Sequence, residues 1–190
     1  MVRNYEDKEL IDRVKSLPSF IYMPKYLLIG VRSREDVFNQ FDDKFYLFIE
    51  STFKVTTSGT TNPGSKSLLG GWLNTNGKGS AIIKADEIYY DVYRHGLHKG
   101  RMEALRQVGN MKYYRDDNNN ELSEEIGEVT EGNYFTNFHF NSYDLVTNIK
   151  KYFINGWSEG CQVANQLDKY KTILALTYNH VVSYALLKEF

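Results

Sequence analysis

Short runs in which aromatic and polar residues alternate constrain the fold of this chain more than any other feature. Ile88–Tyr93 and Asn133–Phe140 both show this alternation, which is typical of strands that bury one face. Aromatic side chains favour pleated, half-buried surfaces over helices, and the chain holds 15 tyrosines and 11 phenylalanines. The sequence therefore predicts a mainly β fold, a β-rich α+β arrangement with a few peripheral helices.

Further strands are expected on both sides of turn-forming segments. Tyr26–Arg32 predicts a strand, and Lys44–Thr56 predicts one long strand or a bent pair. Thr57–Gly64 has the composition of a turn throughout, and Arg94–Gly100 is expected to interrupt the strand that begins at Ile88. These segments place most of the chain in one sheet system.

Helical spacing of apolar residues occurs in three segments. It predicts a short helix over Asn4–Leu17, a second helix over Tyr143–Phe153, and a third that begins at Asp168, whose carboxylate can cap it. Pro18 stops the first helix, so residues 1–25 are expected to form an N-terminal helical appendage and linker. Residues 26–190 are then expected to form a single β-rich domain.

Charge and hydropathy exclude several classes of partner. The formal net charge is −1, so the chain lacks the basic surface that long nucleic acids require. It has no apolar run of membrane-spanning length and no apolar segment near Met1. We expect a protein that is made in the cytoplasm without a signal peptide. A single cysteine forms no internal disulfide, so the fold does not depend on an oxidising compartment.

Cys161, the only cysteine, is the candidate nucleophile. It follows Ser158-Glu159-Gly160, a small and flexible run that lets the backbone approach a ligand, whereas a packing cysteine would have apolar neighbours. A thiol needs a base, and the nearest upstream histidine is His139 on a predicted strand. The alternative is an inert, buried small side chain. The order of histidine before cysteine argues against papain-like peptidases.

These residues resemble the catalytic core of the L,D-transpeptidase family. The matching features are a histidine at the end of a strand, then Ser-x-Gly-Cys, then an aspartate seven residues after the cysteine, here His139, Ser158, Gly160, Cys161 and Asp168. Upstream, Thr57–Gly64 is similar to the Thr- and Gly-containing region that the family carries on its sheet. Trp157–Val163 also resembles a Trp-Ser-x-Gly-Cys-Gln-Val signature of phage and Bacteroidetes proteins.

The resemblance implies an L,D-transpeptidase-like sheet sandwich and a cysteine acyl enzyme that acts on peptidoglycan stem peptides. Cys161 would be the nucleophile and His139 the base, and the backbone around Gly160 and Cys161 would supply the oxyanion donors. Ser158 would orient the histidine or close the turn. The implied chemistry needs no metal and no cofactor. An activated thiol should also be alkylated faster at pH 7 than an ordinary thiol.

Two positions differ from the family pattern. Glu159 stands where the family usually has histidine, and Val163 stands where it has an arginine that would hold an anionic peptide. Arg115, Arg101 or Lys99 are candidates to replace that arginine. Glu159 would raise the pKa of the thiol if it pointed inward, because a neighbouring negative charge disfavours a thiolate.

Histidine and tryptophan side chains supply the remaining candidates. His95 and His98 are spaced for one end of a metal site, but no second pair of ligands follows, so a polar loop is favoured. His98 and Trp157 are expected to line the substrate groove together with Arg115. Trp157 is otherwise plain core.

The sequence thus predicts a cysteine acyltransferase or peptidase that acts on the cell wall. Without a signal peptide, such a protein would reach peptidoglycan after lysis or as part of a virion. The alternative is a non-catalytic structural or virion component that retains the fold, with partners in a virion or other assembly.

Overall fold

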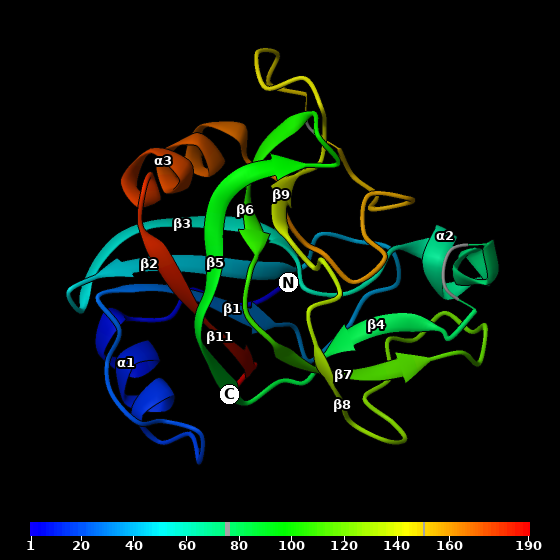
Figure 1. Ribbon diagram of the computed structural model, residues 1–190, viewed down its shortest axis with the longest axis horizontal. Helices are drawn as coiled ribbons and strands as arrows, with labels where there is room; N and C mark the ends of the chain where they lie inside the picture. Colours follow the sequence, from blue (N-terminus) through cyan, green and yellow to red (C-terminus); the bar gives the residue numbers. More distant parts are fainter. Residues whose placement is uncertain (75–76, 150) are drawn as a thin grey trace.

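Eight strands close into a barrel at the centre of the molecule (Figure 1). The computed structural model describes residues 1–74, 77–149 and 151–190. The strands follow the order β1-β11-β5-β6-β9-β10-β3-β2. Their bounds are β1 Tyr26–Arg32, β2 Asp43–Ile49, β3 Thr52–Thr60, β5 Glu87–His98, β6 Met102–Gln107, β9 Phe138–Phe140, β10 Gln162–Ala164 and β11 Val181–Lys188. The predicted mainly β fold is confirmed, but the large sheet closes on itself where a sheet sandwich was expected.

A smaller sheet of three antiparallel strands lies beside the barrel. It consists of β4 Ser80–Ile83, β7 Met111–Asp116 and β8 Thr130–Gly132, in the order β4-β7-β8. Its side chains Ala81, Ile83, Met111 and Tyr113 pack into the same core as the barrel residues. The two sheets therefore share one hydrophobic core, because the inner residues of the small sheet cover part of the barrel.

The N-terminal helix covers the outer face of several barrel strands. Alternate residues of β1 belong to different cores: Leu28 packs in the main core, whereas Leu27 and Ile29 pack in a second one. That second core includes Leu10 and Val14 of α1 (Asp7–Lys15). This follows from the two-residue period of a strand, which turns neighbouring side chains to opposite faces. The predicted first helix is present and buries its apolar face against the barrel.

β2 and β3 form the bent pair that was expected between Lys44 and Thr56. The hairpin turns at Glu50 and Ser51, which both have positive φ angles (51° and 62°), as in the two-residue turn that matches strand twist. β3 then continues to Thr60, so the turn predicted over Thr57–Gly64 begins too early. Strand pairing between β3 and β2 outweighs the local turn propensity there.

β5 runs without interruption through Arg94–Gly96 to His98, so the predicted break was wrong. Six residue pairs with β6 stabilise this extension. A Cβ atom at Gly96 would lie 2.8 Å from the Arg106 Cδ atom, so a larger residue there would displace that side chain. The consequence is that His98 stands at the end of a regular strand.

The remaining helices are short and peripheral. α3 (Leu167–Thr177) begins after Gln166, so Asp168 lies in the first turn and is not the N-cap residue that was predicted. α2 (Ser65–Leu68) and a 3₁₀ turn, η1 (Gly71–Asn74), precede the small sheet. The helix expected over Tyr143–Phe153 is absent from its described residues, with residue 150 outside them. Among the described residues, no helix is both long enough and apolar enough to cross a bilayer.

Candidate active site

β9 holds His139 on the outer face of the barrel. Its neighbours Phe138 and Phe140 point into the main core, so His139 points the opposite way, yet it is only 1% exposed. The His139 Nδ1 atom donates a hydrogen bond to the Phe140 carbonyl oxygen at 2.8 Å. In the neutral ring this leaves a lone pair on Nε2, which is buried without a hydrogen-bond partner among the described residues.

A tight turn places Cys161 directly before the first residue of β10. The Ser158 hydroxyl donates to the Cys161 carbonyl oxygen at 2.8 Å and accepts from the Gly160 N–H at 3.2 Å. Gly160 has a φ of 127°, and a Cβ atom there would lie 2.4 Å from the Ala81 carbonyl oxygen. Two roles were expected for Ser158, and its hydrogen bonds correspond to the second, which is to close the turn. The Phe140 carbonyl orients His139 instead.

The fold brings Cys161 next to both His139 and His98. β10 pairs with β9 in parallel, and this pairing aligns Gln162 with Phe138. Cys161 directly precedes Gln162 and His139 directly follows Phe138, so the predicted nucleophile and base come close together. One ring nitrogen of each histidine and the Cys161 Sγ atom all lie within 4.8 Å of one another. The two imidazoles stack with their centroids 4.0 Å apart, and Sγ lies 3.7 Å from the Phe135 carbonyl oxygen.

All three groups are neutral near pH 7. Burial raises the pKa of the Cys161 thiol to about 11, and Glu159 acts in the same direction, against the Asn137 N–H and Lys99. Burial lowers the pKa of His139 to about 3, with His98 as a second cause. Burial also lowers the pKa of His98 to about 4. These shifts contradict the thiolate at rest that the predicted fast alkylation requires.

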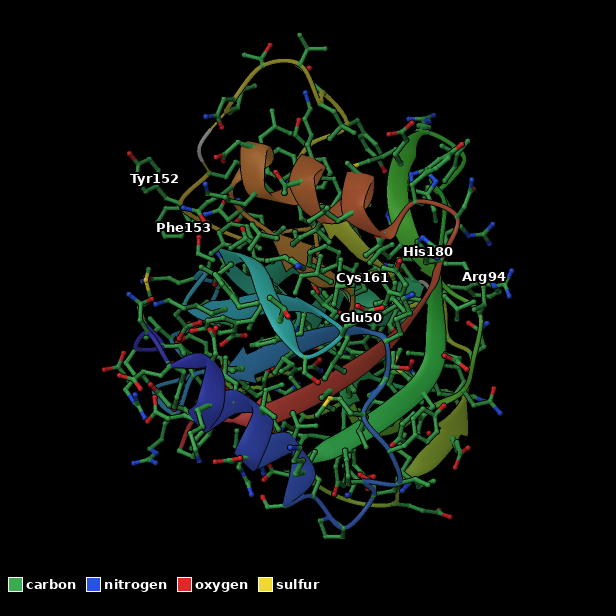
Figure 2. The ribbon with its side chains drawn as sticks, turned by 90° about the vertical axis from the view of Figure 1, so that its left-hand side faces the viewer. Glu50, Arg94, Tyr152, Phe153, Cys161 and His180 are labelled. Atoms are coloured by element: carbon green, nitrogen blue, oxygen red, sulfur yellow. The ribbon has the colours of Figure 1, made fainter. Side chains whose placement is uncertain are left out.

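Cys161 and His98 line a cavity of about 810 Å³. The other predicted substrate-binding residues, Arg115 and Trp157, also line it, and its charged side chains are Lys99, Arg106, Arg115 and Glu159. Three cations against one carboxylate make the cavity a suitable place for an anionic molecule. Tyr152 and Phe153 project from the edge of the molecule in Figure 2, and both side chains are exposed.

Three residues were considered as replacements for the arginine that the L,D-transpeptidase pattern has at position 163, and two of them reach the cavity. Lys99 and Arg115 line it, and the Arg115 guanidinium lies 4.4 Å from the ring centroid of Tyr134, which also lines it. Arg101 instead lies over the Tyr143 ring at 5.8 Å and does not line the cavity. Val163 is fully buried in β10 beside His139.

The histidine pair His95 and His98 does not form one site. Residues three apart on a strand face opposite sides, and His95 packs against Tyr178 with ring centroids 5.0 Å apart. Within residues 1–74, 77–149 and 151–190, the group of side chains that could instead present ligand atoms to a metal ion is His98, His139 and Cys161. Imidazole nitrogen and thiolate sulfur are common zinc ligands. Whether each histidine can bind zinc depends on which of its ring nitrogens carries the proton.

Sequence reasoning missed the contact between His98 and His139. The pattern around His98 suggested a loop, because Gly96 and Gly100 interrupt the aromatic alternation. Hairpin pairing with β6 carries β5 as far as His98, and the long-range pairing of β6 with β9 then places this hairpin beside His139. Asn137 and Phe135 were missed for a different reason, since their roles come from main-chain and amide contacts that no motif records.

Comparisons of this chain with protein-family models, with curated proteins and with solved structures found no match.

Proposed function

We propose that this protein is a cysteine acyltransferase or peptidase that acts on peptidoglycan stem peptides, with L,D-transpeptidase-like or L,D-carboxypeptidase-like chemistry. Two observations carry the proposal: a His139 ring nitrogen lies within 4.8 Å of the Cys161 sulfur, and the Nε2 atom of His139 is buried without a partner among the described residues. A nucleophile next to a base whose other nitrogen is fixed by a third group is the general pattern of an activated nucleophile. Here that third group is the Phe140 carbonyl.

In the proposed reaction, His139 Nε2 takes the thiol proton as Cys161 Sγ attacks a peptide carbonyl. With pKa values of about 11 and about 3, full proton transfer at rest costs of order 10 kcal/mol. A turnover of about 10 per second has a barrier of about 16 kcal/mol. The cost of proton transfer is smaller than this barrier, so the reaction is feasible when proton transfer is coupled to attack by the sulfur. Thiolate therefore forms during the chemical step.

Collapse of the tetrahedral intermediate breaks the C–N bond of a terminal D-residue. The leaving amine takes the proton from His139 Nε2, and an amine or water then releases the acyl group from Cys161. Stem peptides carry carboxylates, and the cations Lys99, Arg106 and Arg115 on the cavity wall give such a substrate a favourable field.

Incubation with purified muropeptides, followed by mass spectrometry of the products, tests the proposal. We expect the loss of a terminal D-residue or a new cross-link, and no product from Cys161→Ser. Burial is enough to raise the pKa of the thiol, but Cys161 keeps part of its surface open to the cavity, so the same substitution should change the free energy of unfolding by less than about 0.5 kcal/mol.

The second candidate function is a non-catalytic structural or virion component. The raised pKa of Cys161 and the valine at position 163 favour it, since both reduce the resemblance to an active enzyme. A packing role predicts that Cys161→Ser buries an unsatisfied hydroxyl, which costs about 1–3 kcal/mol. That loss of stability, together with no muropeptide product from the unmodified protein, would favour this candidate.

A further inference from the structure

A chain of hydrogen bonds fixes the protonation of His98. The Gln107 backbone N–H can only donate, and it donates to the Asn137 Oδ1 atom at 2.9 Å. The Asn137 Nδ2 group therefore faces His98, and it lies 3.0 Å from the His98 Nδ1 atom. An amide nitrogen is a donor, so Nδ1 must be the acceptor and the proton of the neutral ring lies on Nε2.

His98 thus carries its proton on Nε2, in a ring that lies beside the nucleophile. It lines the cavity with Cys161, and its other nitrogen is already engaged by Asn137. Its opposite tautomer distinguishes it from His139, whose proton is on Nδ1 and whose Nε2 is an acceptor. The two stacked rings, one with a donor Nε2 and the other with an acceptor Nε2, therefore lie beside the same sulfur atom.

We infer that the His98 Nε2–H donates a hydrogen bond to the carbonyl oxygen that Cys161 attacks, and so acts as a catalytic oxyanion donor. This inference rests on the proposed acyl-transfer function. A ring nitrogen of His98 lies within 4.8 Å of Sγ. A carbonyl group, with a C–O bond of about 1.2 Å, can therefore place its carbon near the sulfur and its oxygen near the nitrogen.

One of the two backbone donors expected from the sequence is already engaged. The Gly160 N–H, predicted from the sequence to help form the oxyanion site, donates to the Ser158 hydroxyl. A neutral imidazole is also a suitable donor, because it stabilises negative charge without giving up its proton. The lowered pKa of His98, caused first by burial and then by Lys99 and Arg106, keeps the ring neutral at pH 7.

In this step the bonds and charges balance. The S–C bond forms, the thiol proton moves to His139 Nε2, and the carbonyl electron pair moves to oxygen, which accepts from His98 without proton transfer. When the C–O double bond re-forms, the C–N bond breaks and the amine takes the proton from His139. His98 keeps its proton throughout.

The same tautomer argues against a metal ion bound by His98, His139 and Cys161. A zinc ligand needs a lone pair on the coordinating nitrogen and a proton on the other one, which donates to a second group. His139 meets this requirement through Phe140. His98 does not meet it through Nε2, because Asn137 offers its Nδ1 atom a donor.

Acylation of Cys161 by p-nitrophenyl acetate, measured by intact-protein mass spectrometry, tests the inference without the natural substrate. We expect His98→Phe to slow acylation about 10²-fold, as removal of one oxyanion donor does in other enzymes. His98→Gln, which can place an amide N–H near the same position, should recover part of that loss. Alkylation by iodoacetamide, which forms no oxyanion, should proceed at the same rate in all three proteins.

Equal acylation rates for His98→Phe and the unmodified protein would overturn the inference. So would a Co²⁺ complex with a thiolate charge-transfer band that disappears in both His98→Phe and Cys161→Ser. If His98→Phe does not fold, ¹⁵N NMR of the unmodified protein decides, since a proton on His98 Nδ1 would also overturn it. Normal acylation without any muropeptide product would instead reject only the proposed substrate.

Discussion

At the scale of single residues, the site is built from neutral groups in complementary states. Cys161 is a protonated thiol, His139 is an acceptor and His98 is a donor, and each histidine tautomer is fixed by a neighbour of unambiguous chemistry. Burial accounts for most of this neutrality, because it disfavours the charged form of all three side chains. Such a site avoids the cost of holding buried charge before a substrate arrives.

Alkylation kinetics should show this neutral state directly. We expect iodoacetamide to modify Cys161 at least about tenfold more slowly at pH 7 than it modifies a peptide thiol of pKa about 8.5. The rate should continue to rise above pH 9, because the thiol has a pKa of about 11. Glu159→Gln should increase the rate, since the Glu159 carboxylate raises that pKa. A rate that levels off below pH 8 would show a resting thiolate and contradict the neutral site.

At the scale of elements, the sequence predicted strands better than it predicted their ends. Tyr26–Arg32 forms a strand with the predicted bounds, because its apolar run is buried in both cores. Tyr143–Phe153 has helical spacing but no helix in its described part. There the Asp144 carboxylate accepts from the Val146 and Thr147 N–H groups, and Val146 is 88% exposed. Apolar residues at helical spacing do not stabilise a helix when they have no surface to pack against.

The turn before β10 is the element on which the candidate nucleophile depends. Gly160→Ala should therefore destabilise the fold by about 1–3 kcal/mol, because its φ of 127° strains any other residue and Ala81 leaves no room for a Cβ atom. It should also abolish acylation by displacing Cys161. Chemical denaturation and intact-protein mass spectrometry measure the two effects.

Gly156→Ala is the matched control within the same segment. Its added Cβ atom would lie 3.1 Å from the Lys66 Cδ atom, part of a flexible side chain that can move. We expect a change in unfolding free energy below about 0.5 kcal/mol. If the two variants behave alike, the backbone at Gly160 does not position Cys161.

At the scale of the whole molecule, barrel closure lay beyond sequence reasoning. Local alternation predicts strands, but the partners of β9 are β6 and β10, and the pairing of β1 with β11 joins the two ends of the chain. The candidate site depends on these same long-range pairs. Cys161 and His139 could be proposed from the sequence, whereas His98 enters the site only because the β5–β6 hairpin pairs with β9.

The buried histidines should make the stability of the whole fold depend on pH. Their pKa values in the folded protein, about 3 for His139 and about 4 for His98, lie below the unfolded value of about 6.5. The unfolded chain therefore binds more protons, so stability is full above about pH 6.5 and falls as the pH drops toward the folded values. At about pH 5 each histidine should lower the free energy of unfolding by about 2 kcal/mol relative to its value at neutral pH.

Asp43 opposes this trend, because burial and Asp42 raise its pKa to about 7, so the stability that it contributes falls as the pH rises from about 4 to 7. The comparison between variants isolates the histidine. His139→Gln leaves Asp43 in place and removes one titrating ring, so the loss of stability between pH 7.5 and 5 should be about 2 kcal/mol smaller than in the unmodified protein. Urea unfolding at the two pH values measures it. An unchanged difference would mean that burial does not lower the pKa of His139 in the folded protein, and it would contradict the neutral site described for Cys161.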